Sequence, residues 1–276
     1  VDVVYHLAGL TKSLHRRELF RVNEEGTGNL ANACASSPQP PRLVVASSLA
    51  AAGPATPERP RIETDPPNPV SAYGKSKLAG EIAASRFFDR VPTSIVRPPI
   101  VFGEGDVDGF NVFQTIAQMG AHFAPGFGNH LFSAIHADDL VEAMVQVASK
   151  GQLVEENDAS SGVYFAADPQ TFTYAEYGRM IGRCLNRPHA WVIRSPHALV
   201  WGISAFNEAV ARIRRRPHIL NLDKVREASA GSWACSPAKL VSDTGFAPAR
   251  PLEERINQTV DWYVSQGWLE RKRRRD

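Results

Sequence analysis

One short segment, Arg42-Leu43-Val44-Val45-Ala46-Ser47-Ser48, sets the interpretation of this chain. Its apolar, β-branched residues predict a buried strand of a parallel sheet, and the strand ends in two serines. Ligands of open α/β sheets bind at the carboxyl ends of the strands. The two hydroxyl groups therefore lie where such a sheet would place a ligand.

Downstream of this strand, a helix is predicted from residue 72 to about 88, with Ser71 as its cap. Tyr73 and Lys77 share one face of that helix because they are four positions apart. A lysine ammonium beside a phenol favours the phenolate and lowers the tyrosine pKa from about 10 towards neutrality. With a serine hydroxyl, the pair suits proton transfer at a carbinol while a cofactor takes the hydride. A surface tyrosine and lysine, with serines that only cap a strand, is the alternative.

Strands and helices alternate up to about residue 167. Strands are predicted at 3–7, 42–46, 93–97 and 163–166, and helices near 18–36, 72–88, 110–120 and 138–149. This alternation predicts a doubly wound parallel α/β sheet. After Asp168 the pattern is mostly helical and irregular. There, Thr173 and Glu176 predict a capping box before a helix to about Leu185, and 251–264 predicts a final helix.

The composition is that of a soluble enzyme. Of 276 residues, 43% are hydrophobic, which is enough for a core, and the net charge of +2 gives no argument for nucleic acid. Three widely spaced cysteines, Cys34, Cys184 and Cys235, predict reduced thiols in a cytoplasmic setting and no disulfide framework. No apolar run reaches the roughly 18 residues of a membrane span.

Five motifs, in the right order, resemble the extended short-chain dehydrogenase/reductases of the NAD-dependent epimerase/dehydratase family. The motifs are Val3-Val4-Tyr5-His6-Leu7-Ala8-Gly9, Asn23-Glu24-Glu25-Gly26-Thr27, Ser47-Ser48 through Gly53, Arg97-Pro98-Pro99-Ile100-Val101-Phe102-Gly103 and His136-Ala137-Asp138-Asp139-Leu140. The sequence departs from the family at Ala52, where a tyrosine is usual. The resemblance implies a Rossmann-like sheet and a smaller, mixed, mostly helical substrate domain.

By this resemblance, residues 1–98 and 131–168 form the C-terminal part of a dinucleotide-binding domain, and 99–130 and 169–276 a substrate-binding region. Dinucleotide-binding folds open with a strand, a glycine-rich turn and a helix, and no such turn precedes Val1. We therefore expect an N-terminally truncated chain that lacks roughly 60 residues. Such a chain would bind cofactor poorly or fold incompletely.

One stretch fits the dinucleotide pattern by its letters alone. Residues 26–31, Gly-Thr-Gly-Asn-Leu-Ala, match G-x-G-x-x-A. The fingerprint has meaning only between a strand and a helix, and the residues before it are charged helix formers. They predict the interior of a helix, where small residues allow close packing.

The resemblance also implies roles for individual residues. Tyr73 is the expected general acid/base, and Lys77 would lower its pKa and hydrogen-bond the nicotinamide ribose. Ser48 would orient the substrate oxygen, and Asn23 would support the site from the adjacent helix. The expected cofactor is NAD or NADP. Its expected contacts are Ala8, Gly9, Lys12, Ser47, Tyr73, Lys77, Pro98, Pro99 and Val101.

No metal is expected. His136, Asp138 and Asp139 could suggest one, but Asp138 is more simply the N-cap of a helix, with acidic residues near its positive end. The eight histidines show none of the spacings typical of zinc sites. His6 is expected to be a packed residue and not an acid/base.

The resemblance favours an NAD(P)-dependent oxidoreductase or epimerase acting on a nucleotide sugar. A steroid- or dihydroflavonol-type alcohol/ketone oxidoreductase is the alternative, and a non-catalytic dinucleotide-binding regulatory or structural protein is the alternative of another class. Dehydration is not expected, because Leu49 and Ala50 stand where dehydratases carry an Asp-Glu pair.

The expected partners are a small-molecule substrate and a second copy of the chain. The resemblance implies a dimer that forms through the helices at 18–36 and 72–88. An apolar stripe runs along Leu199, Ile203, Phe206, Val210 and Ile213. It is expected to pack over the pocket or a partner subunit; an interfacial membrane helix is the alternative.

Overall fold

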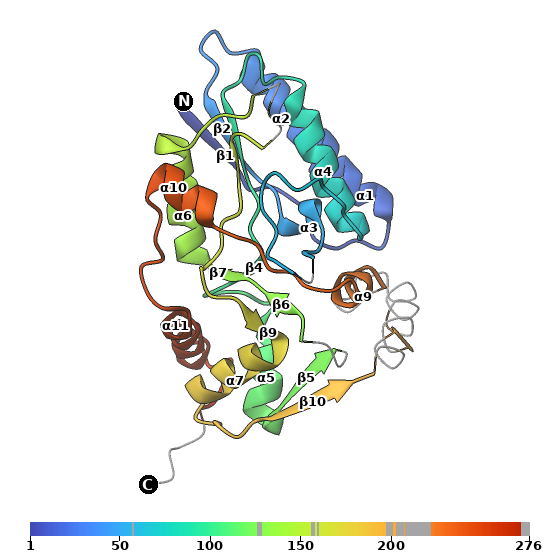
Figure 1. Ribbon diagram of the computed structural model, residues 1–276, viewed down its shortest axis with the longest axis vertical. Coiled ribbons are helices and arrows are strands. Elements are labelled where there is room, and N and C mark those ends of the chain that lie inside the picture. The colour runs from blue at the N-terminus through green and yellow to red at the C-terminus, as the bar shows by residue number, and fades with distance from the viewer. Residues whose placement is uncertain are drawn as a thin grey trace.

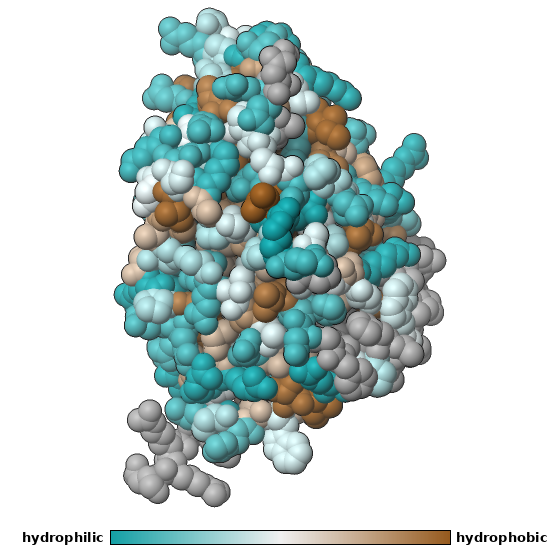
Figure 2. Space-filling view, viewed as in Figure 1, coloured by the Kyte–Doolittle hydropathy of each residue, from teal (hydrophilic) through white to brown (hydrophobic). Residues whose placement is uncertain are grey.

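The computed structural model describes residues 1–56, 58–125, 129–155, 158, 160–196, 201–202, 207 and 222–271. The molecule is elongated, with a parallel sheet and its covering helices at one end and a smaller region of helices and short strand pairs at the other (Figure 1). Hydrophilic residues cover most of the face in Figure 2, and hydrophobic ones form small, separated areas there. Among the described helices, none has the length and apolar character needed to cross a membrane.

The central sheet has four parallel strands in the order β1-β2-β3-β8. They are β1 (Val3–His6), β2 (Arg42–Ala46), β3 (Thr93–Val96) and β8 (Val163–Tyr164). All four predicted strands are confirmed, although the last is shorter than expected. Because the strands are parallel, the segments that follow β1, β2 and β3 meet at one edge of the sheet.

Helices cover both faces of this sheet (Figure 1). One face carries α1 (Arg16–Phe20), η1 (Arg21–Glu25), α2 (Gly26–Ala35) and α4 (Ala72–Ser85). The other carries α6 (Ala137–Lys150) and α10 (Ala238–Thr244). Side chains of β2 alternate between the two cores: Leu43 and Val45 pack towards α2 and α4, and Val44 packs towards α6. This is the predicted doubly wound α/β architecture.

Glycines bring the first-face helices unusually close. A Cβ at Gly28 of α2 would lie 3.3 Å from the Cβ of Ala83, and a Cβ at Gly80 would lie 2.3 Å from the carbonyl oxygen of Asn23. The G-x-G stretch is therefore the interior of a helix, as predicted. η1 is a turn of π-helix at Asn23, a local irregularity that often marks functional sites.

The smaller region is less helical than expected. It contains α5 (Phe110–Met119), α7 (Tyr174–Cys184) and α11 (Leu252–Ser265) around a core that includes Phe113, Ile181 and Tyr263. Short strand pairs lie beside them: β4 (Ile100–Phe102) with β7 (Ala134–His136), β5 (Ala121–Pro125) with β10 (Trp191–Ser195), and β6 (Leu131–Phe132) with β9 (Phe172–Thr173). The capping box of Thr173 and Glu176 is present.

Two expectations need correction. The cap of α6 is His136, whose ring nitrogen accepts from the N–H of Asp138, so Asp138 is in the first turn and is not the N-cap. In addition, α10 packs on α6 and shares its core with the main sheet through Leu240 and Phe246, although residues 169–276 were expected in the substrate-binding region. The stripe from Leu199 to Ile213 lies outside the described residues.

The helix spacing predicts opposite effects for two glycine substitutions. Gly80→Ala should lower the free energy of unfolding by about 1–3 kcal/mol, because the new methyl meets backbone. Gly26→Ala has room, since the nearest atom would lie 3.9 Å away, and should raise it by up to about 1 kcal/mol. Chemical denaturation of both variants measures the difference; equal effects would contradict the close approach.

Candidate active site

Ser48 and Tyr73 meet at the end of β2. The hydroxyl of Ser71 accepts from the N–H of Gly74 at 2.9 Å and caps α4, so Tyr73 stands in the first turn of that helix. Ser48 begins the short helix α3 (Leu49–Ala52) and accepts from the N–H of Ala50 at 3.1 Å. Its side chain lies close enough to that of Tyr73 for its hydroxyl to lower the pKa of the tyrosine. The structure therefore brings together a serine and a tyrosine that are far apart in sequence.

Lys77 lies one turn further along α4, at the ends of β1 and β2. Its ammonium donates to the carbonyl oxygen of Ala46 at 2.6 Å. A Cβ at Gly9 would lie 3.5 Å from the Lys77 Nζ and 3.3 Å from the Asn23 Oδ1. Burial lowers the pKa of Lys77, while the nearby carboxylate of Glu81 acts to raise it.

Asn23 joins the turn after β1 to the helix that carries Tyr73. Its amide donates to the carbonyl oxygen of Leu10 at 2.9 Å and to the hydroxyl of Ser76 at 2.8 Å. Its Oδ1 accepts from the N–H of Leu10 at 2.7 Å. Because Asn23 is only 1% exposed, it acts as an internal clamp on that turn.

His6 is packed beneath the same turn. Its Nε2 lies 2.9 Å from the hydroxyl of Thr27, which donates to the carbonyl oxygen of Asn23 at 2.7 Å. Burial lowers the pKa of His6, and the charge of Lys77 adds to this. A buried neutral imidazole agrees with the expectation of a packed residue.

The residues at the end of β1 fit the nicotinamide end of a dinucleotide. Buried His6 is followed by exposed Leu7, Ala8 and Gly9, so the chain opens to the surface where the strand ends. Gly9 has no side chain, so a ribose could approach its backbone beside the Lys77 ammonium; a methyl group at Gly9 would narrow this space. The glycine-rich turn expected upstream of Val1 lies outside this sequence and stays a prediction.

The other expected cofactor residues differ in accessibility. Val101 is 38% exposed on β4, whereas Pro98 is buried and its carbonyl oxygen accepts from the N–H of Leu49 at 2.8 Å. Pro99, between them, is half-buried. Lys12 forms an ion pair of 2.7 Å with Asp108, which joins the turn after β1 to the loop before α5. Contacts of these residues with a cofactor stay predictions.

Ser47 has a structural partner. Its side chain is buried and its hydroxyl donates to Glu81. Arg97 holds the same carboxylate with two bonds, Nε to Oε1 at 2.9 Å and Nη2 to Oε2 at 2.5 Å. Both partners of this ion pair are 6% exposed. Ser47 thus belongs to a buried network that anchors α4 to the ends of β2 and β3, and its contact with nicotinamide stays a prediction.

Sequence reasoning missed three residues of α9 (Leu222–Ser229), which lies beside the start of α4 (Figure 1). The carboxylate of Asp223 accepts from the N–H groups of Ala72 and Tyr73 at 2.8 and 3.1 Å. The Nζ of Lys224 lies 5.1 Å from the centre of the Tyr73 ring and 2.8 Å from the carboxylate of Glu227. About 150 residues separate α9 from α4, and no local pattern reveals the contact.

The electrostatics of Tyr73 differ from the expectation. Burial raises the pKa of Tyr73 above its ordinary value, and this outweighs the hydrogen bond from Ser48 and the charge of Lys224, which both lower it. The charge of Glu227 raises it further. The cation that acts on Tyr73 here is Lys224, whereas the sequence pointed to Lys77.

Two other polar clusters resemble functional sites, but their contacts give each of them a structural role. Ligand atoms of Glu104, His136 and Asp138 lie within 4.8 Å of one another, as a metal site would require. However, the guanidinium of Arg255 binds Asp138 at 3.2 Å, and the Nδ1 of His136 accepts from the N–H of Asp138 at 3.3 Å. Arg255 already supplies positive charge, so the arrangement does not require a metal ion.

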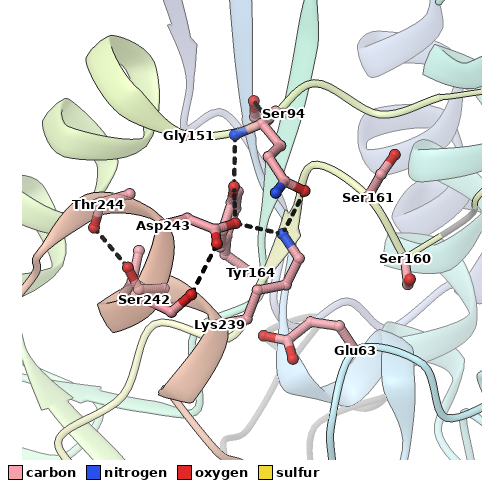
Figure 3. Close-up of polar contacts among 12 residues, drawn as sticks. Glu63, Ser94, Gly151, Ser160, Ser161, Tyr164, Lys239, Ser242, Asp243 and Thr244 are labelled. Atoms are coloured by element: carbon pink, nitrogen blue, oxygen red, sulfur yellow. Dashed lines mark hydrogen bonds and ion pairs between the residues drawn. The ribbon is translucent and has the colours of Figure 1, made fainter.

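The second cluster is another tyrosine–lysine pair, shown in Figure 3. The Nζ of Lys239 lies 3.9 Å from the centre of the Tyr164 ring. The Tyr164 hydroxyl donates to Asp243 at 2.9 Å and accepts from the N–H of Gln152 at 2.6 Å. These contacts of Tyr164 with Lys239 and Asp243 hold α10 against β8. Burial raises the pKa of Tyr164 and the adjacent Asp243 carboxylate raises it further, so this tyrosine is a poor acid/base.

The chain belongs to the NAD dependent epimerase/dehydratase family, whose model matches residues 1–160. This confirms the family, the Rossmann-like fold class and an enzyme of the extended short-chain dehydrogenase/reductase type. The family is NAD-dependent, in agreement with the expected NAD or NADP.

Curated relatives match along nearly the whole chain. It is 28% identical over 272 residues to the ceramide reductase of Caulobacter vibrioides, covering 97% of this chain and 76% of that protein. It is 25% identical over 277 residues to 3β-hydroxysteroid-dehydrogenase/decarboxylase isoform 1 of Arabidopsis thaliana, covering 94% of this chain and 62% of that protein.

Solved structures support the fold. MoeE5 in complex with UDP-glucose and NAD matches with a TM-score of 0.72 at 23% identity, covering 96% of this chain and 80% of that chain. UDP-glucuronic acid 4-epimerase from Bacillus cereus in complex with NAD matches with a TM-score of 0.73 at 16% identity, covering 96% and 75%.

The buried anchor of α4 predicts a large effect for Glu81→Gln. This change leaves the buried Arg97 without its anion and should lower the free energy of unfolding by about 3 kcal/mol or more. Glu253→Gln is the matched control, because Glu253 binds Arg183 with the same two-bond geometry while both side chains are nearly half exposed. It should cost less than about 1 kcal/mol. Similar losses in denaturant unfolding would contradict the assignment.

Proposed function

We propose that this chain carries the active site of an NAD(P)-dependent oxidoreductase that interconverts a secondary alcohol and a ketone. The observation that carries the proposal is the meeting of Ser48 and Tyr73 at the end of β2, with Lys77 one turn further along α4. These groups lie at the strand ends, where open α/β sheets bind ligands. Asn23 supports them through the turn after β1 and through Ser76.

Each residue has a step that follows from its position. In alcohol oxidation, the Tyr73 phenolate takes the proton of the substrate hydroxyl; in ketone reduction, the phenol returns it to the substrate oxygen. Ser48 hydrogen-bonds the same oxygen and holds it against Tyr73. Lys77 binds the ribose hydroxyls, and the charge of Lys224 favours the phenolate. The nicotinamide, when bound, accepts or supplies the hydride.

A lipid-like alcohol or ketone is the substrate class that we favour. The relatives by sequence include a ceramide reductase and a 3β-hydroxysteroid dehydrogenase, and both names denote lipid-like compounds. Two exposed apolar side chains lie near the edge of the sheet where the strands end: Leu7, directly after β1, is 64% exposed, and Val101, in β4, is 38% exposed. This reverses the order of the two substrate classes that the sequence suggested.

A nucleotide sugar is the second candidate. The solved structures that carry UDP-sugars support it, but at 23% identity or less the likeness concerns the fold alone. A diphosphate would need free arginines, whereas Arg183 binds Glu253 in two bonds and Arg194 donates to Asn129 at 3.1 Å. These contacts weaken the case for diphosphate recognition. The homodimer through the helices at 18–36 and 72–88 and the cytoplasmic location stay predictions.

Tyr73→Phe tests the proposed function. Loss of the acid/base should reduce turnover by about 100-fold or more. The assay follows NADH or NADPH absorbance with three probes: an N-acyl-3-ketosphinganine, a 3-hydroxysteroid and UDP-glucose. Tyr164→Phe is the matched control, because it also removes a phenol that lies beside a lysine. It should keep turnover, because Tyr164 lies outside the candidate active site. Near-wild-type turnover of Tyr73→Phe would refute the site, and turnover of UDP-glucose alone would refute the lipid-like substrate.

A further inference from the structure

Helix α9 brings a second set of charged residues to the candidate tyrosine. In Figure 1, α9 lies between the parallel sheet with its helices and the smaller region, beside α3 and the start of α4. Three of its eight residues, Asp223, Lys224 and Glu227, act on Tyr73 or its backbone. The motifs that predicted the site include none of them.

Asp223 fixes the backbone at the start of α4. Its two carboxylate oxygens accept separately from the N–H groups of Ala72 and Tyr73. The first N–H groups of a helix have no partner within the helix and carry partial positive charge, which a carboxylate satisfies well. Ser71 satisfies the next one, at Gly74. Asp223 therefore helps to set where the Tyr73 ring leaves the helix.

Lys224 and Glu227 form an ion pair beside the Tyr73 ring. The ammonium lies over the ring at 5.1 Å from its centre, a favourable cation–π position. The Lys224 side chain is 39% exposed, whereas that of Glu227 is 15% exposed and its Oε1 is buried without a hydrogen-bond partner. The Trp233 indole donates to the carbonyl oxygen of Glu227 at 2.8 Å, which holds the end of α9 in place.

The two charges of this pair act on Tyr73 in opposite directions. Lys224 favours the phenolate and Glu227 disfavours it. The other groups around Tyr73 are engaged elsewhere: Lys77 donates to Ala46, and Asp223 accepts from backbone N–H groups. Ser48 contributes a neutral hydrogen bond. Lys224 and Glu227 are thus the charged pair with a direct electrostatic effect on the tyrosine.

We propose that α9 completes the active site, with Asp223 positioning Tyr73 and the Lys224–Glu227 pair tuning its strength as acid and base. The proposal rests on the function proposed above. It makes Lys224 and Glu227 positioning residues, which act through Tyr73 and not on the substrate. It also means that Tyr73 depends on a helix that is distant in sequence. The position of α9 against the start of α4 therefore sets the activity of the site.

The test is the ionisation of Tyr73 itself, which needs no substrate. Tyrosinate absorbs in the ultraviolet, and the difference between the pH titrations of the chain with and without Tyr73→Phe isolates this tyrosine. Near the ordinary tyrosine pKa of about 10, Lys224→Met should lower the Tyr73 tyrosinate fraction about threefold. Glu227→Gln should raise it about threefold, because it removes the opposing charge.

The opposite signs are what identify the role. Both substitutions break the same ion pair, so a purely structural pair would shift the titration in the same direction for both. Lys224→Arg should restore the wild-type titration. Lys239→Met is the matched control, because it removes the ammonium above Tyr164 and should leave Tyr73 unchanged. Far-ultraviolet circular dichroism checks that each variant is folded; if Lys224→Met is not, Lys224→Gln takes its place.

The outcomes separate this proposal from the function on which it rests. Shifts of opposite sign support the tuning pair. Shifts of the same sign, or none, overturn it, even if Tyr73→Phe abolishes turnover. If Tyr73→Phe keeps turnover, the proposed function fails whatever the titration shows.

Discussion

The buried ion pair between Glu81 and Arg97 is the interaction on which the site depends. Tyr73, Lys77 and Glu81 follow one another at intervals of four along α4 and so lie on one face. Arg97 follows β3 and Ser47 follows β2, and both bind the Glu81 carboxylate. Anchoring Glu81 to the two strand ends therefore fixes the whole face over the edge of the sheet where ligands bind.

Around this anchor, separate parts of the chain converge on Tyr73 and Lys77. Asn23 ties the turn after β1 to α4, and Gly80 lets the two helices approach closely enough for that contact. Lys77 then bridges the ends of β1 and β2. The site is thus a product of packing between distant segments, in which each polar contact also positions a helix. These contacts give the buried charges of Glu81 and Arg97 fixed partners.

Local patterns predicted the strands, the start of α4 at Ser71 and the capping box at Thr173, because each depends on residues close in sequence. They did not predict the strand pairs of the smaller region, such as β6 with β9, whose pairing depends on tertiary contacts. Nor did they show that Ser47 faces Glu81, since adjacent serines look alike in sequence. The contact of α9 with Tyr73 also lay beyond any local pattern.

The central claim is that Ser48 and Tyr73 hold the reacting oxygen of a substrate. A crystal structure of the chain with NAD and a 3-ketosteroid tests it most directly. The account predicts the keto oxygen within about 2.6–3.2 Å of both hydroxyl groups, with the nicotinamide ribose against Lys77. A keto oxygen bound elsewhere, with Ser48 and Tyr73 in contact only with each other, would contradict it.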